Sequence, residues 1–181
     1  MSWKNVKTHY QIKHIVQVRE GLICVGSPYV SDLLKVSPDG SVTWGALGPS
    51  GNDDLARYYA EMTADPQKLR DLIALPDTFE SALPVFTYKG GDIIEKQCEA
   101  YDWPNVTHDG DVMYENTYSQ DRDKVVRWAK ENAAAGVRRQ DRRIGELREQ
   151  IAEAEKRRDK DAADLAKLDA SYPGIEKEGA L

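Results

Sequence analysis

Residues 137–170 read VRRQDRRIGELREQIAEAEKRRDKDAADLAKLDA, and this stretch decides how the chain is interpreted. Its apolar residues recur with the spacing of one helix face, at Val137, Ile144, Leu147, Ile151, Ala154, Leu165 and Leu168. From Ile144 to Ala154 the intervals are 3, 4 and 3, the a/d pattern of a coiled coil. The pattern predicts a long helix over residues 119–170. Its heptads, over residues 137–168, would extend about 48 Å at 1.5 Å per residue.

Two polar residues interrupt this apolar seam. Arg158 and Asp161 stand where the repeat requires apolar side chains. Such residues weaken a coiled coil, and they can also fix its register or orientation. Because a lone helix cannot bury an apolar stripe, we expect a partner helix, and we favour a homodimer. Two alternatives stay open: a break near residues 159–161 that lets the helix fold back on itself, and a helix packed on its own domain.

The charge of the chain is unevenly distributed. Residues 1–120 contain 10 Lys and Arg against 17 Asp and Glu, a net of −7, whereas residues 121–181 contain 15 against 14, a net of +1. An acidic body disfavours nucleic-acid binding, because phosphate contacts need positive surface. No secretory signal or membrane-length apolar run is present, and two cysteines are too few for a disulfide framework. We therefore expect a cytoplasmic protein with no membrane partner.

The first part of the chain predicts an antiparallel β-meander followed by a helical hairpin. Four apolar runs, separated by turns that contain Gly or Pro, indicate short strands over residues 14–18, 22–25, 33–36 and 41–44. Asn52 and Asp65 are good helix caps, and the helices that follow them carry apolar faces. A second β-hairpin is expected around Gly90-Gly91.

The predicted fold class is thus α+β. We expect a globular domain over residues 1–118 and a coiled-coil-like helix over residues 119–170 that begins at a Ser119 cap. Residues 171–181 are expected to form a flexible tail.

Aromatic residues outside the seam are candidates for contact with a target protein. Trp44, Tyr101, Trp103 and Tyr114 lie in segments that are richer in aromatic residues than loops normally are. Tyr and Trp dominate the energetics of many protein interfaces. Packing into a small β domain is the alternative role for these residues.

Basic residues precede the best heptads. Arg138, Arg139, Arg142 and Arg143 form two rows with a four-residue spacing along the helix. A nucleic-acid-binding arm beside a dimer seam has such residues, so a dimeric nucleic-acid-binding protein is one alternative function. Asp141, Glu146 and Glu149 interleave with the Arg rows, which favours an ordinary solvated face instead.

An acidic loop gives the second alternative, a small metal-dependent enzyme. His108, Asp109, Asp111 and Glu115 place three carboxylates close together in the sequence, and carboxylates bind hard cations. The full EF-hand spacing is absent, and Asp-Gly is commonly a plain turn. The chain also has no nucleophile elbow or phosphate-binding Gly loop. We therefore expect no catalytic residues, no metal and no cofactor.

Two adjoining segments carry a resemblance. EKQCEAYDWPNVTHDG at residues 95–110 and MYENT at residues 113–117 resemble small uncharacterised accessory proteins of tailed phages and prophages, in which a charged C-terminal helix follows. The resemblance covers about residues 85–170. It implies a phage accessory protein in the host cytoplasm that binds and modulates or inhibits a host protein, for host takeover or against host defence.

Overall fold

The computed structural model describes residues 2–49 and 51–174, and the chain forms two units. Unit 1 comprises Met1–Lys130 and unit 2 comprises Glu131–Leu181. The sequence predicts a domain boundary at residue 118, and the structure places it later. The reason is that Val125 and Ala129, in the first turns of the last helix, are buried with unit 1.

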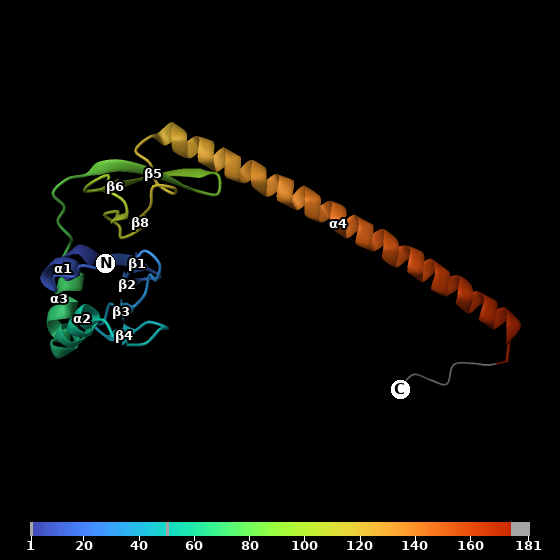
Figure 1. The fold of residues 1–181 in the computed structure, drawn as a ribbon, viewed down its shortest axis with the longest axis horizontal. Coiled ribbons are helices and arrows are strands. Elements are labelled where there is room, and N and C mark those ends of the chain that lie inside the picture. The colour runs from blue at the N-terminus through green and yellow to red at the C-terminus, as the bar shows by residue number, and fades with distance from the viewer. Residues whose placement is uncertain (1, 50, 175–181) are drawn as a thin grey trace. The chain divides into compact units, whose positions relative to one another are not determined.

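The four-stranded meander that the sequence predicts is present, with the strand order β1-β2-β3-β4 (Figure 1). The strands are β1 (Ile15–Arg19), β2 (Leu22–Gly26), β3 (Leu34–Val36) and β4 (Val42–Trp44). All three pairings are antiparallel, and Val16 lies opposite Val25 at the centre of the first. Glu20 and Gly21 both adopt positive φ, which gives the two-residue turn whose twist suits a hairpin.

Helices α1 (Trp3–His9), α2 (Asp53–Ala64) and α3 (Pro66–Ala74) complete the first core. The two predicted caps are confirmed, because Asn52 Oδ1 accepts from the Leu55 amide at 3.1 Å and Asp65 Oδ1 accepts from the Lys68 amide at 2.9 Å. Apolar side chains of α2 and α3 pack in one cluster with those of the sheet. The fully buried members include Tyr58, Met62, Leu69, Ile23 and Leu34.

The second half of unit 1 is built on a hairpin of β5 (Leu83–Lys89) and β6 (Asp92–Cys98), whose turn is the expected Gly90-Gly91. Two short strands, β7 (Asn105–Val106) and β8 (Val112–Met113), pair with each other. A separate apolar cluster lies here, made of Val85, Cys98, Met113 and Tyr118. The antiparallel sheet, the helical hairpin and the long final helix together confirm the α+β class.

Helix α4 runs without a break from Arg122 to Ser171. Its cap is Asp121, whose Oδ1 accepts from the amides of Asp123 at 2.9 Å and Lys124 at 3.2 Å. The predicted Ser119 cap is wrong, because Ser119 instead exchanges two backbone hydrogen bonds with Phe86 of β5. The continuous helix also contradicts the fold-back alternative. The predicted tail partly coincides with helix at Ser171, and its residues 175–181 lie outside the described residues.

Among the described helices, none combines the length and the apolar character that a bilayer crossing requires.

Candidate functional site

The candidate site is the apolar seam of α4, and the heptad register assigns every member. The a positions are Val137, Ile144, Ile151, Arg158 and Leu165, and Tyr172 continues the series; the d positions are Gln140, Leu147, Ala154, Asp161 and Leu168. The large apolar members remain exposed, from 40% for Leu147 to 61% for Val137. The structure therefore brings all the seam residues predicted from the sequence onto one accessible face of unit 2.

The composition of the seam suits a two-stranded coiled coil. Val137, Ile144 and Ile151 are β-branched residues at a positions, whereas Leu147 and Leu168 occupy d positions. In parallel coiled coils this division favours two strands over three or four. The charged residues of the seam are confined to the adjacent layers of Arg158 and Asp161, after which the apolar pattern resumes at Leu165; the d position of Gln140 is polar but uncharged.

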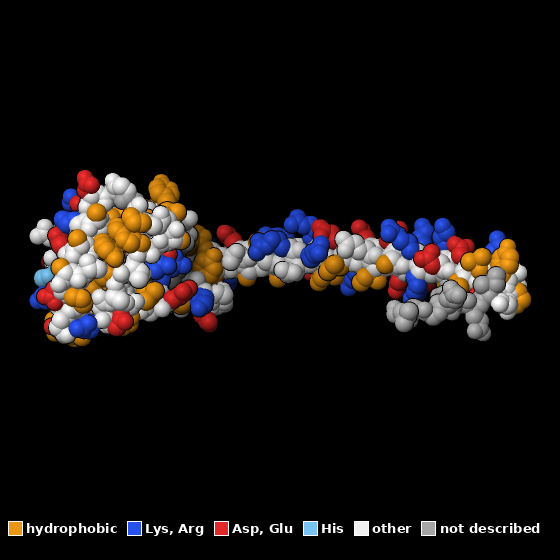
Figure 2. Space-filling model, turned by 90° about the horizontal axis from the view of Figure 1, so that it is seen from below, with side chains coloured by type: hydrophobic (Ala, Val, Ile, Leu, Met, Phe, Trp, Pro, Cys, Tyr) orange, Lys and Arg blue, Asp and Glu red, His pale blue; other side chains and the backbone are white. Residues whose placement is uncertain are grey.

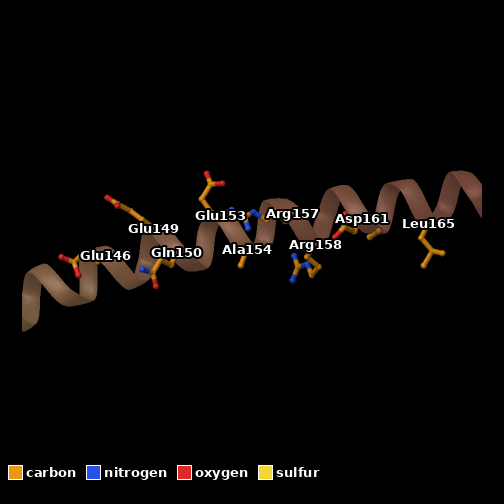
Figure 3. A pocket seen from close by; sticks show the side chains of 10 residues that line it. Glu146, Glu149, Gln150, Glu153, Ala154, Arg157, Arg158, Asp161 and Leu165 are labelled. Atoms are coloured by element: carbon orange, nitrogen blue, oxygen red, sulfur yellow. The ribbon is translucent and has the colours of Figure 1, made fainter. Parts of the chain in front are cut away.

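A shallow hollow runs along the same helix around the polar break (Figure 3). Two of its lining residues, Ala154 and Ala162, have small side chains, and the others have longer ones. The lining residues near the break are Ala154, Arg157, Arg158, Asp161, Ala162 and Leu165. A hollow on a single helix is a gap between its own side chains and is open to solvent, so we interpret it as a place for side chains of a facing helix.

The Arg rows occupy the other side of the helix. Arg138, Arg139 and Arg142 fall at b, c and f positions, and Arg143 flanks the seam at a g position. In Figure 2 most Lys and Arg side chains of the helix lie along its upper edge, and apolar side chains gather on the lower edge near its middle. Arg143 forms an exposed ion pair with Glu146 at 3.2 Å. The placement leaves the seam free of this basic surface.

The four aromatic candidates do not form one patch. Trp44 stacks on Tyr59 with ring centroids 5.0 Å apart and packs against the first core. Tyr101 and Trp103 pack against the second cluster, and the Tyr101 hydroxyl donates to the Pro84 carbonyl at 3.0 Å. All four side chains, including that of Tyr114, are half-buried. Packing within unit 1 accounts for much of their surface, as the alternative role supposed.

Tyr114 nevertheless marks a surface of unit 1 that the sequence alone did not identify. It borders two hollows, one shared with Trp103, Pro104 and Lys124 and the other shared with Arg19 and Tyr29. Tyr29 is 96% exposed, the most exposed large apolar side chain of unit 1. The available signal was the Ser27-Pro28-Tyr29 turn, which presents an aromatic residue between two strands. We call the side chains of Tyr29, Trp103 and Tyr114, with Pro104, the Tyr114 surface.

The acidic loop does not form the metal site that was one alternative. The Lys96 ammonium lies between the two carboxylates, 2.6 Å from Asp109 Oδ2 and in contact with Asp111 Oδ2. The His108 ring stacks on Phe79 with centroids 3.7 Å apart, away from a shared site. No group of three or more His, Cys, Asp or Glu side chains converges for a metal within residues 2–49 and 51–174. Lys96 therefore occupies the position between the two carboxylates that a cation would take, and the alternative of a metal-dependent enzyme gains no support from the described residues.

The loop is a turn held by the half-buried side chain of Lys96. Thr107 is fully buried; its hydroxyl accepts from the Asp111 amide at 2.9 Å, and it donates to Asp109 Oδ1. Burial opposes the charged form of Asp109, but the hydrogen bonds from Lys96 and Thr107 outweigh it and hold the Asp109 pKa below its ordinary value. Burial and the neighbouring carboxylates raise the pKa of the Tyr118 hydroxyl, which donates to Asp111 Oδ2 at 3.3 Å.

Comparison with protein-family models, with curated proteins and with solved structures found no match to this chain.

Proposed function

We propose that this protein is a non-enzymatic binding factor that dimerises through α4 and engages a partner protein through unit 1. The observation that carries the proposal is the accessible apolar seam of α4. Its Ile144, Leu147 and Ile151 side chains are each at least 40% exposed on one helix face. A soluble helix gains free energy when such a stripe is covered by a complementary helix.

The Tyr114 surface is the proposed contact for the partner. Tyr and Trp supply large contact areas at interfaces, and here Tyr29 and Trp103 flank Tyr114. Residues 1–120 carry a net charge of −7, which favours a partner with a basic surface. Together with the resemblance to phage accessory proteins, this supports a role in modulating or inhibiting a protein of the host cytoplasm.

The dimer is tested by light scattering on a sizing column. The full chain is compared with a chain that ends at Ala135, which keeps the buried residues Val125 and Ala129 and loses the seam. The full chain is expected at twice the monomer mass and the shortened chain at the monomer mass. A monomeric full chain at all concentrations measured would contradict the proposal.

Partner capture is tested separately. The full chain and a variant with Tyr29→Ser and Tyr114→Ser are used as baits in a host lysate. Capture of the same host protein by the wild type and not by the variant supports the Tyr114 surface. Equal capture by both proteins would move the binding surface elsewhere.

The alternative of a dimeric nucleic-acid-binding protein rests on the Arg rows, which lie on an accessible face of α4. It predicts binding to duplex DNA that weakens steeply with salt, because phosphate contacts release counterions. An absence of DNA binding at low salt would contradict this alternative function.

A further inference from the structure

The polar break in the seam carries information about how two copies of α4 meet. Arg158 and Asp161 have opposite charge, occupy consecutive core layers and border one hollow. We propose that two copies pair antiparallel, in the register that places Arg158 of each copy opposite Asp161 of the other. The proposal specifies the geometry of the dimer proposed above and depends on that dimer.

The register follows from the heptads. In an antiparallel pair each a residue faces a d residue of the other helix, and the two-fold axis here passes between Asp159 and Lys160. Ile151 then faces Leu168 of the second copy, and Ala154 faces Leu165. Leu147 faces Tyr172, whose amide still donates to the Leu168 carbonyl at 2.9 Å. Each layer occurs twice by symmetry, so between Leu147 and Tyr172 every apolar core residue meets an apolar one and every charge meets its opposite.

The flanking positions agree with this arrangement. In an antiparallel coiled coil, g positions lie beside g positions and e positions beside e positions. The register brings Arg157 beside Asp164 of the second copy and Arg148 beside Asp169, each pair again occurring twice. These pairs are at the rim, so they contribute more to the choice of register than to affinity.

A parallel dimer in register has the opposite charge pattern. It stacks Arg158 on Arg158 and Asp161 on Asp161 inside the seam. At its rim, where g faces the following e position, Arg143 meets Arg148 and Asp164 meets Asp169. Like charges in contact are costly, and more so where they are partly desolvated.

Other antiparallel registers lose the match. A shift of one heptad in either direction places Arg157 beside Arg157 of the second copy or Asp164 beside Asp164. A shift of two heptads that lengthens the overlap keeps favourable rim pairs but sets Arg158 against Leu147 and Asp161 against Ile144. Each of these leaves a charge in the seam without an opposite charge.

Six of the residues that line the hollow of Figure 3 would make up two successive holes of a coiled coil. A hole is made by residues i, i+3, i+4 and i+7. Ala154, Arg157, Arg158 and Asp161 form the first, which would receive Asp161 of the second copy between two guanidinium groups. Arg158, Asp161, Ala162 and Leu165 form the second, where the small Ala162 leaves room for the incoming Arg158. In the single chain Arg158 Nη2 pairs with Asp159 Oδ1 at 2.6 Å, and both side chains are mostly exposed. Replacing this pair by the pair with Asp161 of the second copy therefore costs little free energy.

The decisive experiment uses cysteine pairs in the full-length protein. Ala154→Cys and Leu165→Cys chains are oxidised separately and as a mixture, with the wild type as the control for the buried Cys24 and Cys98. Disulfides need Cα atoms within about 7 Å. The antiparallel register predicts a disulfide dimer in the mixture and little in either chain alone. A dimer in which Ala154→Cys links to itself would overturn the register and leave the proposed dimer standing, whereas a monomer by light scattering would overturn both.

A charge exchange gives a second measurement. In the antiparallel register Arg158→Asp turns two attractive layers into repulsive ones, and we expect the dimer dissociation constant to rise at least tenfold. The double change Arg158→Asp with Asp161→Arg restores the pairing and should return it to within a fewfold of the wild type. In a parallel dimer the single change only replaces one like-charged layer by another, so an unchanged constant for Arg158→Asp would refute the antiparallel pairing.

Discussion

Replacing Ile151 by alanine tests whether the seam of α4 holds a dimer together. Ile151 occupies an a position and is 58% exposed in the single chain. Full burial of an isoleucine side chain contributes about 1.5–3 kcal/mol. Only the exposed part of Ile151 can be newly buried on pairing, which leaves roughly 1–1.7 kcal/mol per chain. Because both chains carry the change and alanine retains some of the contact, the dimer should lose about 2–3 kcal/mol, or a 30- to 150-fold rise in dissociation constant.

The assay is sedimentation equilibrium over a range of protein concentrations, with helix content followed by circular dichroism. Alanine has a higher helix propensity than isoleucine, so a weaker dimer cannot be attributed to a weaker helix. Arg142→Ala is the matched control, since Arg142 lies at an f position on the opposite side of α4. Equal dissociation constants for Ile151→Ala and Arg142→Ala would refute the assignment of the seam as the dimer contact.

Three further predictions concern unit 1, each measured by urea denaturation. Gly110 has φ +94°, and a Cβ there would lie 2.5 Å from Val18 Cγ2, so Gly110→Ala should lower the free energy of unfolding by about 2–3 kcal/mol. Gly91→Ala is the control: it has open space around it and should change stability by less than about 0.5 kcal/mol. Asp121→Ala removes the cap of α4 and should cost about 1 kcal/mol, while Asp121→Asn keeps a capping oxygen and should cost much less; equal losses would show that the cap hydrogen bonds are not the cause. Lys96→Met leaves the Asp109 and Asp111 carboxylates without their shared cation and should cost about 1 kcal/mol at pH 7, a modest figure because both carboxylates are at least half exposed. The folded Asp109 pKa lies below its ordinary value, so the ionised carboxylate stabilises the fold above about pH 4, and this stabilisation is lost as the pH falls through the folded pKa. The difference in unfolding free energy between wild type and Lys96→Met should therefore shrink below about pH 4. A difference that stays constant would contradict the ion-pair explanation.

Elements with strong local signals were predictable from the sequence. The Asn52 and Asp65 caps and the Gly90-Gly91 turn each rest on neighbouring residues alone, and the structure has all three. Helix α1 has no such signal: its N-cap residue Ser2 makes no cap hydrogen bond and its first turn has no acidic residue. The distant Asp77 accepts from the amides of Lys4 and Asn5, and Trp3 and Val6 of the helix are buried. A helix of this kind depends on tertiary contacts that a single sequence does not reveal.

The candidate sites also differ in whether their sequence signals are local or depend on distant residues. The seam was predictable because a heptad depends only on spacing within one helix. The ion pairs of the acidic loop could not be predicted, because Lys96, which occupies the space between Asp109 and Asp111, comes from strand β6. Trp103 and Tyr114 of the Tyr114 surface were among the predicted target contacts, but Tyr29 was missed because it lies far from Tyr114 in the chain, although the Tyr114 hydroxyl donates to the Pro28 carbonyl at 3.3 Å. Ser119 was taken as a cap because its pairing with Phe86 is likewise nonlocal.

The exposure of α4 beyond Lys130 has a thermodynamic consequence. Only Val125 and Ala129 of this helix are buried, and from Val137 to Ser171 all of its side chains are accessible. Gly136 and Gly145 each lower helix stability by about 1 kcal/mol relative to alanine. Without a covering surface, this segment melts gradually with temperature rather than in one cooperative step. In the proposed dimer, mass action links helix content to association, so we expect the amount of ordered chain in solution to rise with the protein concentration.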